Sequence, residues 1–314
     1  MSEVKNVATR VGFGNALLAL GKERDDFIVM DADLAAATQT GVFKKEFPER
    51  FYNCGIAEQN MVSIAAGVAA TGKKVVCSSF AMFASGRAFE QIRNSIGYPH
   101  LNVIIGATHG GISVGEDGAT HQANEDIAIM RTIPGMTVIN PADVVEAELA
   151  VRAAFDHDGP VYMRFGRLAV PVVFDENYKF EIGKGVELKE GSDVTIIATG
   201  LMVKEALEAY ELLKAEGISA RIINMATIKP LDKEIVIKAA KETGAIVTAE
   251  EHSVIGGLGS AVSEVLSEEY PVPVVKLGVN DVFGHSGPAV KLLDEFGLRA
   301  INIVEKAKKA ISMK

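Results

Sequence analysis

Asn53-Cys54-Gly55-Ile56-Ala57-Glu58-Gln59-Asn60 joins two kinds of apolar pattern in this chain of 314 residues. A short apolar run ends at Gly55, and an apolar helical pattern at residues 61–71 follows Glu58. The stretch therefore predicts a strand-to-helix junction with one carboxylate at the positive end of a helix. Such an acid commonly serves only as a cap, which contributes at most about 1 kcal/mol. A larger role for Glu58 depends on what the rest of the chain places beside it.

Short apolar runs and helical patterns alternate along the whole chain. Runs that predict strands cover residues 27–30, 74–78, 102–106, 136–140, 161–164, 194–198, 220–224, 245–248 and 272–277. Helical patterns cover residues 4–22, 61–71, 89–96, 125–131, 143–155, 203–216, 233–243 and 260–268. Apolar strands that alternate with helices are typical of α/β proteins, in which helices cover both faces of a mostly parallel sheet. We therefore expect an α/β fold made of doubly wound units.

Residues 171–193 interrupt this alternation, because they combine glycines and other turn-forming residues without a clear period. Such a segment is typical of a connection between domains. We expect residues 1–172 to form a first domain, residues 173–192 a linker, and residues 193–314 a second, smaller domain with a parallel or mixed sheet.

The composition narrows the classes of partner. Lys and Arg number 32 and Asp and Glu number 41, so the net charge is −9. An acidic chain is a poor match for nucleic acid. The two cysteines, Cys54 and Cys77, fit a reducing compartment. The N-terminus has no signal-peptide pattern, and no apolar run reaches the length of a membrane span. We expect a cytoplasmic protein that binds neither membranes nor nucleic acid.

The richest candidate site is the loop Thr108-His109-Gly110-Gly111-Ile112-Ser113-Val114-Gly115-Glu116-Asp117-Gly118-Ala119-Thr120-His121-Gln122. It follows a predicted strand, and parallel α/β sheets place their functional groups in such loops. Histidine is the side chain best suited to move protons near neutral pH. A solvated surface loop is the alternative interpretation. Phe80 and Phe83 follow another predicted strand, where they suit either stacking on a flat heterocycle or a place in the core.

Several of these segments together resemble the transketolase family. They are Gly55-Ile56-Ala57-Glu58-Gln59-Asn60, the Phe80/Phe83 pair, Thr108-His109, and Gly115-Glu116-Asp117-Gly118-Ala119-Thr120-His121-Gln122. The resemblance runs from Ala8-Thr9-Arg10 to Phe283-Gly284-His285-Ser286-Gly287, and it covers only the C-terminal half of a full-length transketolase. It implies that residues 1–172 are a pyrimidine-binding domain of the thiamine-diphosphate fold. It implies that residues 193–314 are a transketolase C-terminal-like domain, used for assembly and support.

The resemblance also implies a cofactor site. Transketolases use thiamine diphosphate, which serves as the electron sink for carbon–carbon cleavage. By resemblance, Glu58 is catalytic and shares a proton with a ring nitrogen of the cofactor's aminopyrimidine. Phe80 and Phe83 would pack against that ring, and Asp33 would line the cofactor or the dimer contact. Many relatives have a third aromatic residue where this chain has Gly86.

Substrate contacts follow from the same resemblance. The family's grip on the sugar phosphate falls on Arg10, His109 and Arg164, and Arg167 is an alternative to Arg164. Guanidinium groups suit phosphate because they donate in a bidentate fork. Asp117 would bind a sugar hydroxyl. His121 would be catalytic by moving protons at the reacting carbonyl and hydroxyl groups.

One family motif is absent from the sequence. Relatives bind the cofactor's diphosphate and Mg²⁺ through Gly-Asp-Gly and a later Asn, and this chain contains no Gly-Asp-Gly. A diphosphate needs Mg²⁺ held by oxygen ligands. We therefore expect no metal site on this chain, and an N-terminal transketolase subunit that supplies the diphosphate and Mg²⁺ half. The chain alone should be inactive, and we expect a heterotetramer that contains a homodimer of this chain.

The expected function is transfer of a two-carbon ketol unit from a ketose phosphate to an aldose phosphate, as in pentose phosphate metabolism. One alternative is a subunit similar to deoxyxylulose-phosphate synthase or to the β chain of a 2-oxoacid dehydrogenase. Another is a non-catalytic regulatory subunit with the same fold. Two histidines around Asp117 favour transketolase, because a polyhydroxy acceptor needs hydroxyl contacts.

Overall fold

The larger of two central sheets has seven strands in the order β12-β6-β7-β5-β4-β2-β3. The computed structural model describes residues 6–314. The strands of this sheet are β2 (Phe27–Asp31), β3 (Phe51–Asn53), β4 (Lys74–Phe80), β5 (Val103–Thr108), β6 (Thr137–Ile139), β7 (Val161–Arg164) and β12 (Thr227–Lys229). Neighbouring strands are parallel except at the edge, where β12 is antiparallel to β6.

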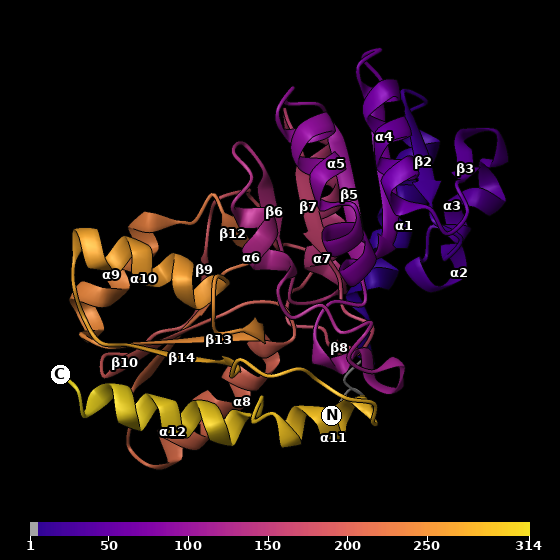
Figure 1. Cartoon of the computed structure of the whole chain (residues 1–314). Helices are drawn as coiled ribbons and strands as arrows, with labels where there is room; N and C mark the ends of the chain where they lie inside the picture. The colour runs from indigo at the N-terminus through magenta and orange to yellow at the C-terminus, as the bar shows by residue number, and fades with distance from the viewer. Residues whose placement is uncertain (1–5) are drawn as a thin grey trace.

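Helices cover both faces of this sheet (Figure 1). The helical segments of the first half are α1 (Thr9–Glu23), α2 (Ala35–Thr38), α3 (Gly41–Glu46), η1 (Pro48–Arg50), α4 (Glu58–Ala69), η2 (Met82–Arg87), α5 (Phe89–Gln91), η3 (Ile92–Gly97), η4 (Ile112–Asp117), α6 (Asp126–Arg131) and α7 (Val144–Asp156). Phe13 of α1 and Phe155 of α7 bury one face of the sheet, and Met61 of α4 and Ile127 of α6 bury the other. Burial on both faces explains why the strands are almost continuous apolar runs.

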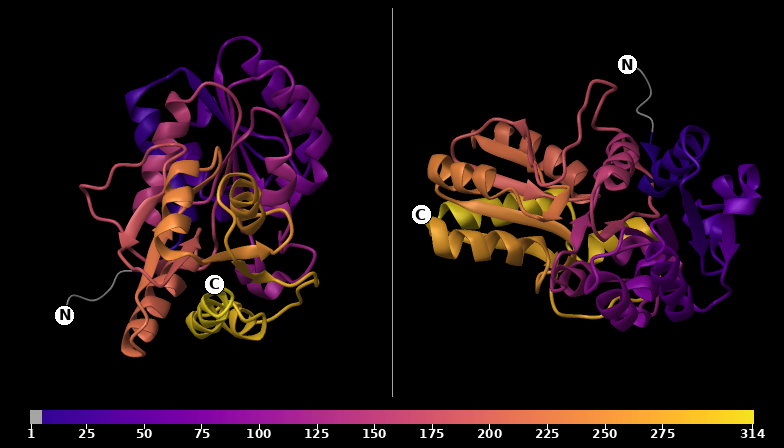
Figure 2. Two further views of the ribbon diagram at one scale, coloured as in Figure 1. Left: turned by 90° about the vertical axis from the view of Figure 1, so that its left-hand side faces the viewer. Right: turned by 90° about the horizontal axis from the view of Figure 1, so that it is seen from above.

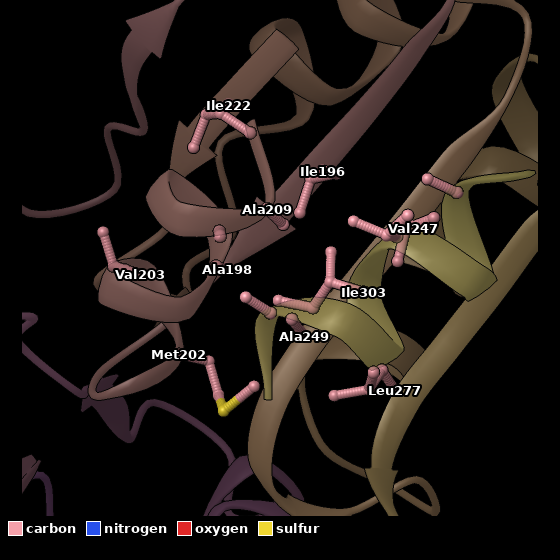
Figure 3. Close-up of a cluster of buried hydrophobic side chains, with 14 of the residues drawn as sticks. Ile196, Ala198, Met202, Val203, Ala209, Ile222, Val247, Ala249, Leu277 and Ile303 are labelled. Atoms are coloured by element: carbon pink, nitrogen blue, oxygen red, sulfur yellow. The ribbon is translucent and has the colours of Figure 1, made fainter. Parts of the chain in front are cut away.

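The second sheet has five strands in the order β14-β13-β10-β11-β9. They are β9 (Val186–Lys189), β10 (Val194–Ala198), β11 (Ala220–Asn224), β13 (Ile246–Ser253) and β14 (Val274–Val279), and all pairs are parallel except β9–β11. Its helices are α8 (Met202–Ala215), α9 (Lys233–Thr243), α10 (Leu258–Glu269), α11 (Ala289–Glu295) and α12 (Ala300–Ile311). On the α8 and α12 face, Ile196, Val247 and Leu277 of the strands pack with Met202 and Ile303 (Figure 3). Helices α9 and α10 cover the opposite face.

The α/β class with two doubly wound units is confirmed (Figure 2). The two units are more interleaved than the pattern predicts. The linker expected at residues 173–192 contains β9, which joins the second sheet as its antiparallel edge. In the other direction, β12 belongs to the second half of the sequence but pairs with β6 of the first sheet.

Two local predictions differ from the structure. The first helix starts at Thr9, after the short strand β1 (Asn6–Val7), which pairs with β8 (Val170–Pro171). The expected start of that helix at Val4 lies outside the described residues. The helix expected at residues 89–96 is part of a longer segment in which π-helical turns, η2 and η3, flank α5. Within residues 6–314, no helix has the length and hydrophobicity needed to cross a membrane.

Candidate functional site

The carboxyl ends of parallel strands bring the candidate residues to one edge of the first sheet. Glu58 starts the helix that follows β3, Phe80 ends β4, and His109 follows β5. This edge faces the second half of the chain, where α11 packs against η4 (Figure 1). Ligands of open α/β sheets bind at this edge. The topology therefore places residues from separate segments of the sequence around one site.

Glu58 is a buried carboxylate at the first position of α4, with 1% of its surface exposed. Its Oε1 accepts a hydrogen bond from Ser79 Oγ at 3.1 Å, and its Oε2 forms an ion pair with Arg87 at 2.8 Å. The guanidinium of Arg87 also lies 4.7 Å from the centre of the Phe83 ring. Glu58 is thus held in one orientation by contacts that a simple helix cap does not have.

Arg87 is a residue of this site that the sequence did not reveal. It ends the π-helical turn η2, which carries Phe83 four positions earlier. π-Helical turns are rare in proteins, and those that occur frequently lie at functional sites. Here the turn directs an arginine onto a glutamate 29 positions earlier in the chain. A basic residue soon after two aromatic residues was the available signal, but it does not identify Glu58 as the partner.

Four rings form an aromatic wall beside Glu58. Phe80 stacks on His109 with ring centroids 3.8 Å apart, and it is nearly parallel to Phe83 at 6.1 Å and 15°. His121 and Phe83 form an edge-to-face pair with ring centroids 5.1 Å apart. The structure therefore brings together Phe80, Phe83, His109 and His121. Such rings suit a flat heterocycle, and the buried carboxylate suits a ring nitrogen that exchanges a proton.

A cationic cluster lies behind this wall. Arg10 Nη1 is 3.4 Å from His109 Nε2 and donates to Ala37 O at 2.7 Å. Arg10 Nε is buried without a hydrogen-bond partner among the described residues. Burial and the nearby charge of Arg167 both lower the pKa of Arg10. Two guanidinium groups within electrostatic reach of one another suit an anion such as phosphate.

His109 is held neutral in this cluster. Burial, and then the charges of Arg10 and Arg167 and the proximity of His121, lower the pKa of His109 to about 3. Thr108 Oγ1 lies 2.9 Å from its Nδ1. The backbone of His109 has a φ of 59°, a left-handed conformation that is uncommon for residues other than glycine. His109 is therefore suited to hydrogen bonding and stacking, and not to accepting protons near neutral pH.

The low pKa of His109 predicts acid destabilisation. An unfolded histidine titrates near 6.5, so below that pH the unfolded state binds a proton that the folded state refuses. The stabilisation is complete above about pH 6.5 and is lost as the pH falls toward 3. Between about pH 7 and 4.5, titration of His109 is expected to cost the wild type about 2–3 kcal/mol of unfolding free energy. We expect the His109→Gln variant to lack this part of the loss. Urea unfolding at both pH values measures it. Equal losses in the variant and the wild type would contradict the assignment.

Arg164, which the resemblance assigns to the phosphate grip, is held by groups of the interior. It is 3% exposed, and its Nε forms an ion pair with Asp126 at 2.9 Å. Its Nη2 donates to the carbonyl oxygens of Ala123 and Glu251 at 3.0 and 2.9 Å. Two of its three guanidinium nitrogens, Nε and Nη2, thus have partners in the interior. Arg167, the alternative, is partly exposed, donates to Val114 O and pairs with Glu116, and its charge is near enough to lower the pKa of Arg10.

Asp117, His121 and Asp33 lie on more exposed parts of the site. Asp117 is 3.9 Å from Arg167, and Thr120 Oγ1 is 2.9 Å from Nδ1 of His121, which leaves Nε2 available. Asp33 is exposed, has a φ of 67°, and accepts a hydrogen bond from Asn53 at 2.8 Å. The site thus presents Asp117 and His121 toward solvent, where a polyhydroxy substrate can reach them.

Asp31, two positions before Asp33, is the buried acid of this segment. It accepts hydrogen bonds from Leu34 N, Thr38 Oγ1 and Thr40 Oγ1. Burial raises the pKa of Asp31, and these hydrogen bonds oppose that rise. Asp31 therefore fixes the loop that carries Ala37, whose carbonyl oxygen holds Arg10. Within residues 6–314, no three His, Cys, Asp or Glu side chains are close enough to hold a metal ion.

The first sheet is a doubly wound α/β unit that carries a buried glutamate and stacked phenylalanines at its carboxyl edge, an arrangement that suits a flat heterocycle. The chain belongs to the transketolase family. Residues 5–172 match the transketolase pyrimidine binding domain, and residues 183–303 match the transketolase C-terminal domain. The first of these domains implies thiamine diphosphate as the cofactor and a transferase as the class of enzyme.

Several relatives have the same length. A protein of Methanocaldococcus jannaschii described as a transketolase C-terminal section is 54% identical over 300 residues, which are 95% of this chain and 94% of the relative. The 6-deoxy-6-sulfo-D-fructose transketolase subunit SqwH of Clostridium sp. strain MSTE9 is 46% identical over 93% of this chain and 90% of its own length. A solved split-gene transketolase, described as an inactive β4 tetramer, has a TM-score of 0.91 and 54% identity and covers 99% of this chain and 100% of its own.

Other relatives are about twice as long. Human transketolase is 42% identical over 296 residues, which are 93% of this chain and 47% of the human protein. The chain therefore spans about half of a full-length transketolase. The resemblance to the C-terminal half of a full-length transketolase is confirmed.

Proposed function

We propose that this chain is the C-terminal subunit of a split transketolase. With a separate subunit that binds the cofactor's diphosphate, it transfers a two-carbon ketol unit from a ketose phosphate to an aldose phosphate. The observation that carries this proposal is the cluster of two cations, Arg10 and Arg167, with the neutral His109, which stacks on Phe80. A phosphate group bound there extends the rest of a sugar past Asp117 and His121 toward Glu58.

Each residue has a distinct role in this proposal. Thiamine diphosphate, when bound, supplies the electron sink for carbon–carbon cleavage. Glu58 holds and releases a proton at the ring nitrogen of the aminopyrimidine, and Phe80 and Phe83 exclude water from that ring. His121 Nε2 moves a proton at the reacting oxygen of the sugar. Asp117 accepts a hydrogen bond from a sugar hydroxyl. Because Asp117 lies 3.9 Å from Arg167, the groups that bind the hydroxyl and the phosphate are neighbours.

The proposal includes a partner because this sequence lacks Gly-Asp-Gly. An N-terminal transketolase subunit would hold the diphosphate and Mg²⁺, with the cofactor at the interface. A related split transketolase forms an inactive β4 tetramer, which supports a chain that self-associates and depends on its partner. We propose a cytoplasmic heterotetramer with two copies of each chain. Asp33, exposed beside Asn53, is available to the cofactor or to that contact.

Substrate selection tests the proposed reaction. The two chains are mixed with thiamine diphosphate and Mg²⁺ and given xylulose 5-phosphate with ribose 5-phosphate, a 6-sulfonated ketose, or pyruvate. We expect ketol transfer from the phosphorylated ketose. Faster transfer from the sulfonated donor, the type of substrate in the name of one relative, would contradict the assignment to phosphate. Pyruvate consumption would indicate a deoxyxylulose-phosphate synthase-like or 2-oxoacid dehydrogenase-like subunit. No reaction of any kind would favour a regulatory subunit.

A further inference from the structure

Strand β13 carries three consecutive buried polar side chains, Glu250, Glu251 and His252. Polar groups this deeply buried need partners, because leaving one unsatisfied costs about 1–3 kcal/mol. Glu250 accepts from the backbone of Leu258 and Gly259 at the start of α10 and so acts within its own domain. Glu251 points the other way, and its partner belongs to the first domain.

Glu251 reaches the loop that carries the candidate catalytic residues. Its Oε1 accepts a hydrogen bond from the backbone N–H of Ser113 at 2.6 Å, across 138 positions of sequence. Ser113 lies between His109 and Asp117, at the start of η4. Burial raises the pKa of Glu251, and Arg164 and Ser113 oppose that rise. The ionised and protonated forms can both accept this hydrogen bond, so the contact holds in either state.

The two glycines after His109 leave room for Glu251 and Arg164, where any larger residue would collide with them. A Cβ atom on Gly111 would lie 2.4 Å from Glu251 Cδ, and one on Gly110 would lie 2.4 Å from Arg164 Nε. Gly111 also has a φ of 90°, which favours glycine. The loop backbone thus lies directly against the two side chains. This close approach accounts for the Gly110-Gly111 pair that follows His109.

The far end of the loop is held to the same strand. Arg164 donates to the carbonyl oxygens of Ala123 and Glu251 together, and Ser253 N donates to Asn124 O at 2.7 Å. Gly111 N donates to Ala123 O at 2.9 Å, which closes the base of the loop. Both ends of the segment with Asp117 and His121 therefore meet β13 of the second domain.

We propose that Glu251 is a positioning residue, through which the second domain sets the conformation of the catalytic loop and so the placement of His109, Asp117 and His121. The second domain then acts directly on the catalytic loop, which goes beyond the general assembly and support that the resemblance implies. The catalytic consequence rests on the proposed function, whereas the structural consequence does not. Misplacement of reacting groups by about 1 Å can cost up to about 100-fold in rate.

Three variants test this inference. Glu251→Gln keeps both shape and acceptor, Glu251→Met keeps shape and removes the acceptor, and Glu250→Met removes the neighbouring acceptor that serves α10. Hydrogen exchange of peptides within residues 109–122 is measured on this chain alone, and kcat and KM on the assembled enzyme. We expect Glu251→Met to speed exchange in the loop at least about tenfold. We expect it to lower kcat by about 10–100-fold with a smaller change in KM.

The matched variants separate positioning from general stability. Glu251→Gln is expected to restore slow exchange and kcat to within about threefold of the wild type, because an amide oxygen also accepts from Ser113 N. Glu250→Met is expected to speed exchange at the start of α10 and to leave the 109–122 loop unchanged. Unchanged loop exchange in Glu251→Met, or equal loop effects of the two methionine variants, would overturn the proposal.

A second measurement covers the case in which Glu251→Met does not fold. In the wild-type chain, the Ser113 amide is expected to exchange as slowly as the amides of β13, because the bond to Glu251 ties it to that strand. Exchange at the rate of an exposed loop amide such as Thr120 would overturn the proposal. An assembled enzyme that is inactive on phosphosugars would instead refute the proposed function and leave the exchange results valid.

Discussion

Glu58→Gln is expected to reduce turnover of the assembled enzyme by about 10²–10⁴-fold, the range for loss of a positioned acid–base group. Glutamine has the same size and can still accept the hydrogen bond from Ser79, but it cannot take and return a proton. Arg87 would lose its ionic partner, and as a half-exposed side chain it can be solvated instead. We therefore expect the fold to survive. Steady-state kinetics and circular dichroism measure the two effects.

A glutamate in another helix provides the control for this substitution. Glu234 occupies the first turn of α9, as Glu58 occupies that of α4, but it is exposed and pairs with Lys184 at 3.4 Å. Glu234→Gln is expected to leave kcat unchanged, because only a cap-like contribution is lost. A Glu58→Gln enzyme with near-normal kcat would show that Glu58 is a cap and not a proton-transfer group.

Arg164→Met is expected to lower the free energy of unfolding by about 3–5 kcal/mol, because it leaves Asp126 buried without a compensating charge. Asp126 is fully buried, and Tyr162 Oη, which donates to it at 2.8 Å, remains its principal partner. Urea unfolding of the chain alone measures this loss. Replacing the acid as well, in Asp126→Leu with Arg164→Met, is expected to recover part of it, since a removed pair costs less than a broken one.

Arg167→Met is the matched test of the phosphate assignment. Arg167 is partly exposed and its carboxylate partners, Glu116 and Asp117, are exposed as well. We expect unfolding free energy within about 1 kcal/mol of the wild type, as for other surface ion pairs. We expect kcat/KM for a phosphorylated donor to fall by roughly 10–100-fold, the loss of a charge-assisted hydrogen bond. The reverse pattern, with stable Arg164→Met and impaired phosphate binding, would restore Arg164 as the ligand.

The fold was accessible from the sequence because its strands are buried on both faces. Residues 161–164 and 194–198 are apolar runs with sharp ends, and the structure has strands with the same bounds. Short edge strands carry no such signal. β9 and β12 have only four and three residues, which is too short to show a period, and each pairs on one side only. That is why the sequence predicts two separate units and a plain linker.

From residue patterns alone, the sequence groups candidate site residues only where they share one segment. His109, Asp117 and His121 share a loop, and Phe80 and Phe83 share a turn, so their grouping is local. Arg164 and Glu251 meet the site across long sequence separations. An arginine three positions from another looks equivalent in sequence, and only burial distinguishes Arg164 from Arg167. Contacts between distant segments are set by packing, which no local pattern encodes.

The central claim is that this chain holds one half of a site that a second polypeptide completes. The most direct measurement is a titration at a fixed concentration of this chain, with thiamine diphosphate, Mg²⁺, xylulose 5-phosphate and ribose 5-phosphate present. The partner, a subunit carrying Gly-Asp-Gly and the later Asn, is added in steps. We predict no ketol transfer by either chain alone, and a rise that reaches its plateau at one partner per chain. Ketol transfer by this chain without the partner, at a rate that the partner does not change, would contradict the account.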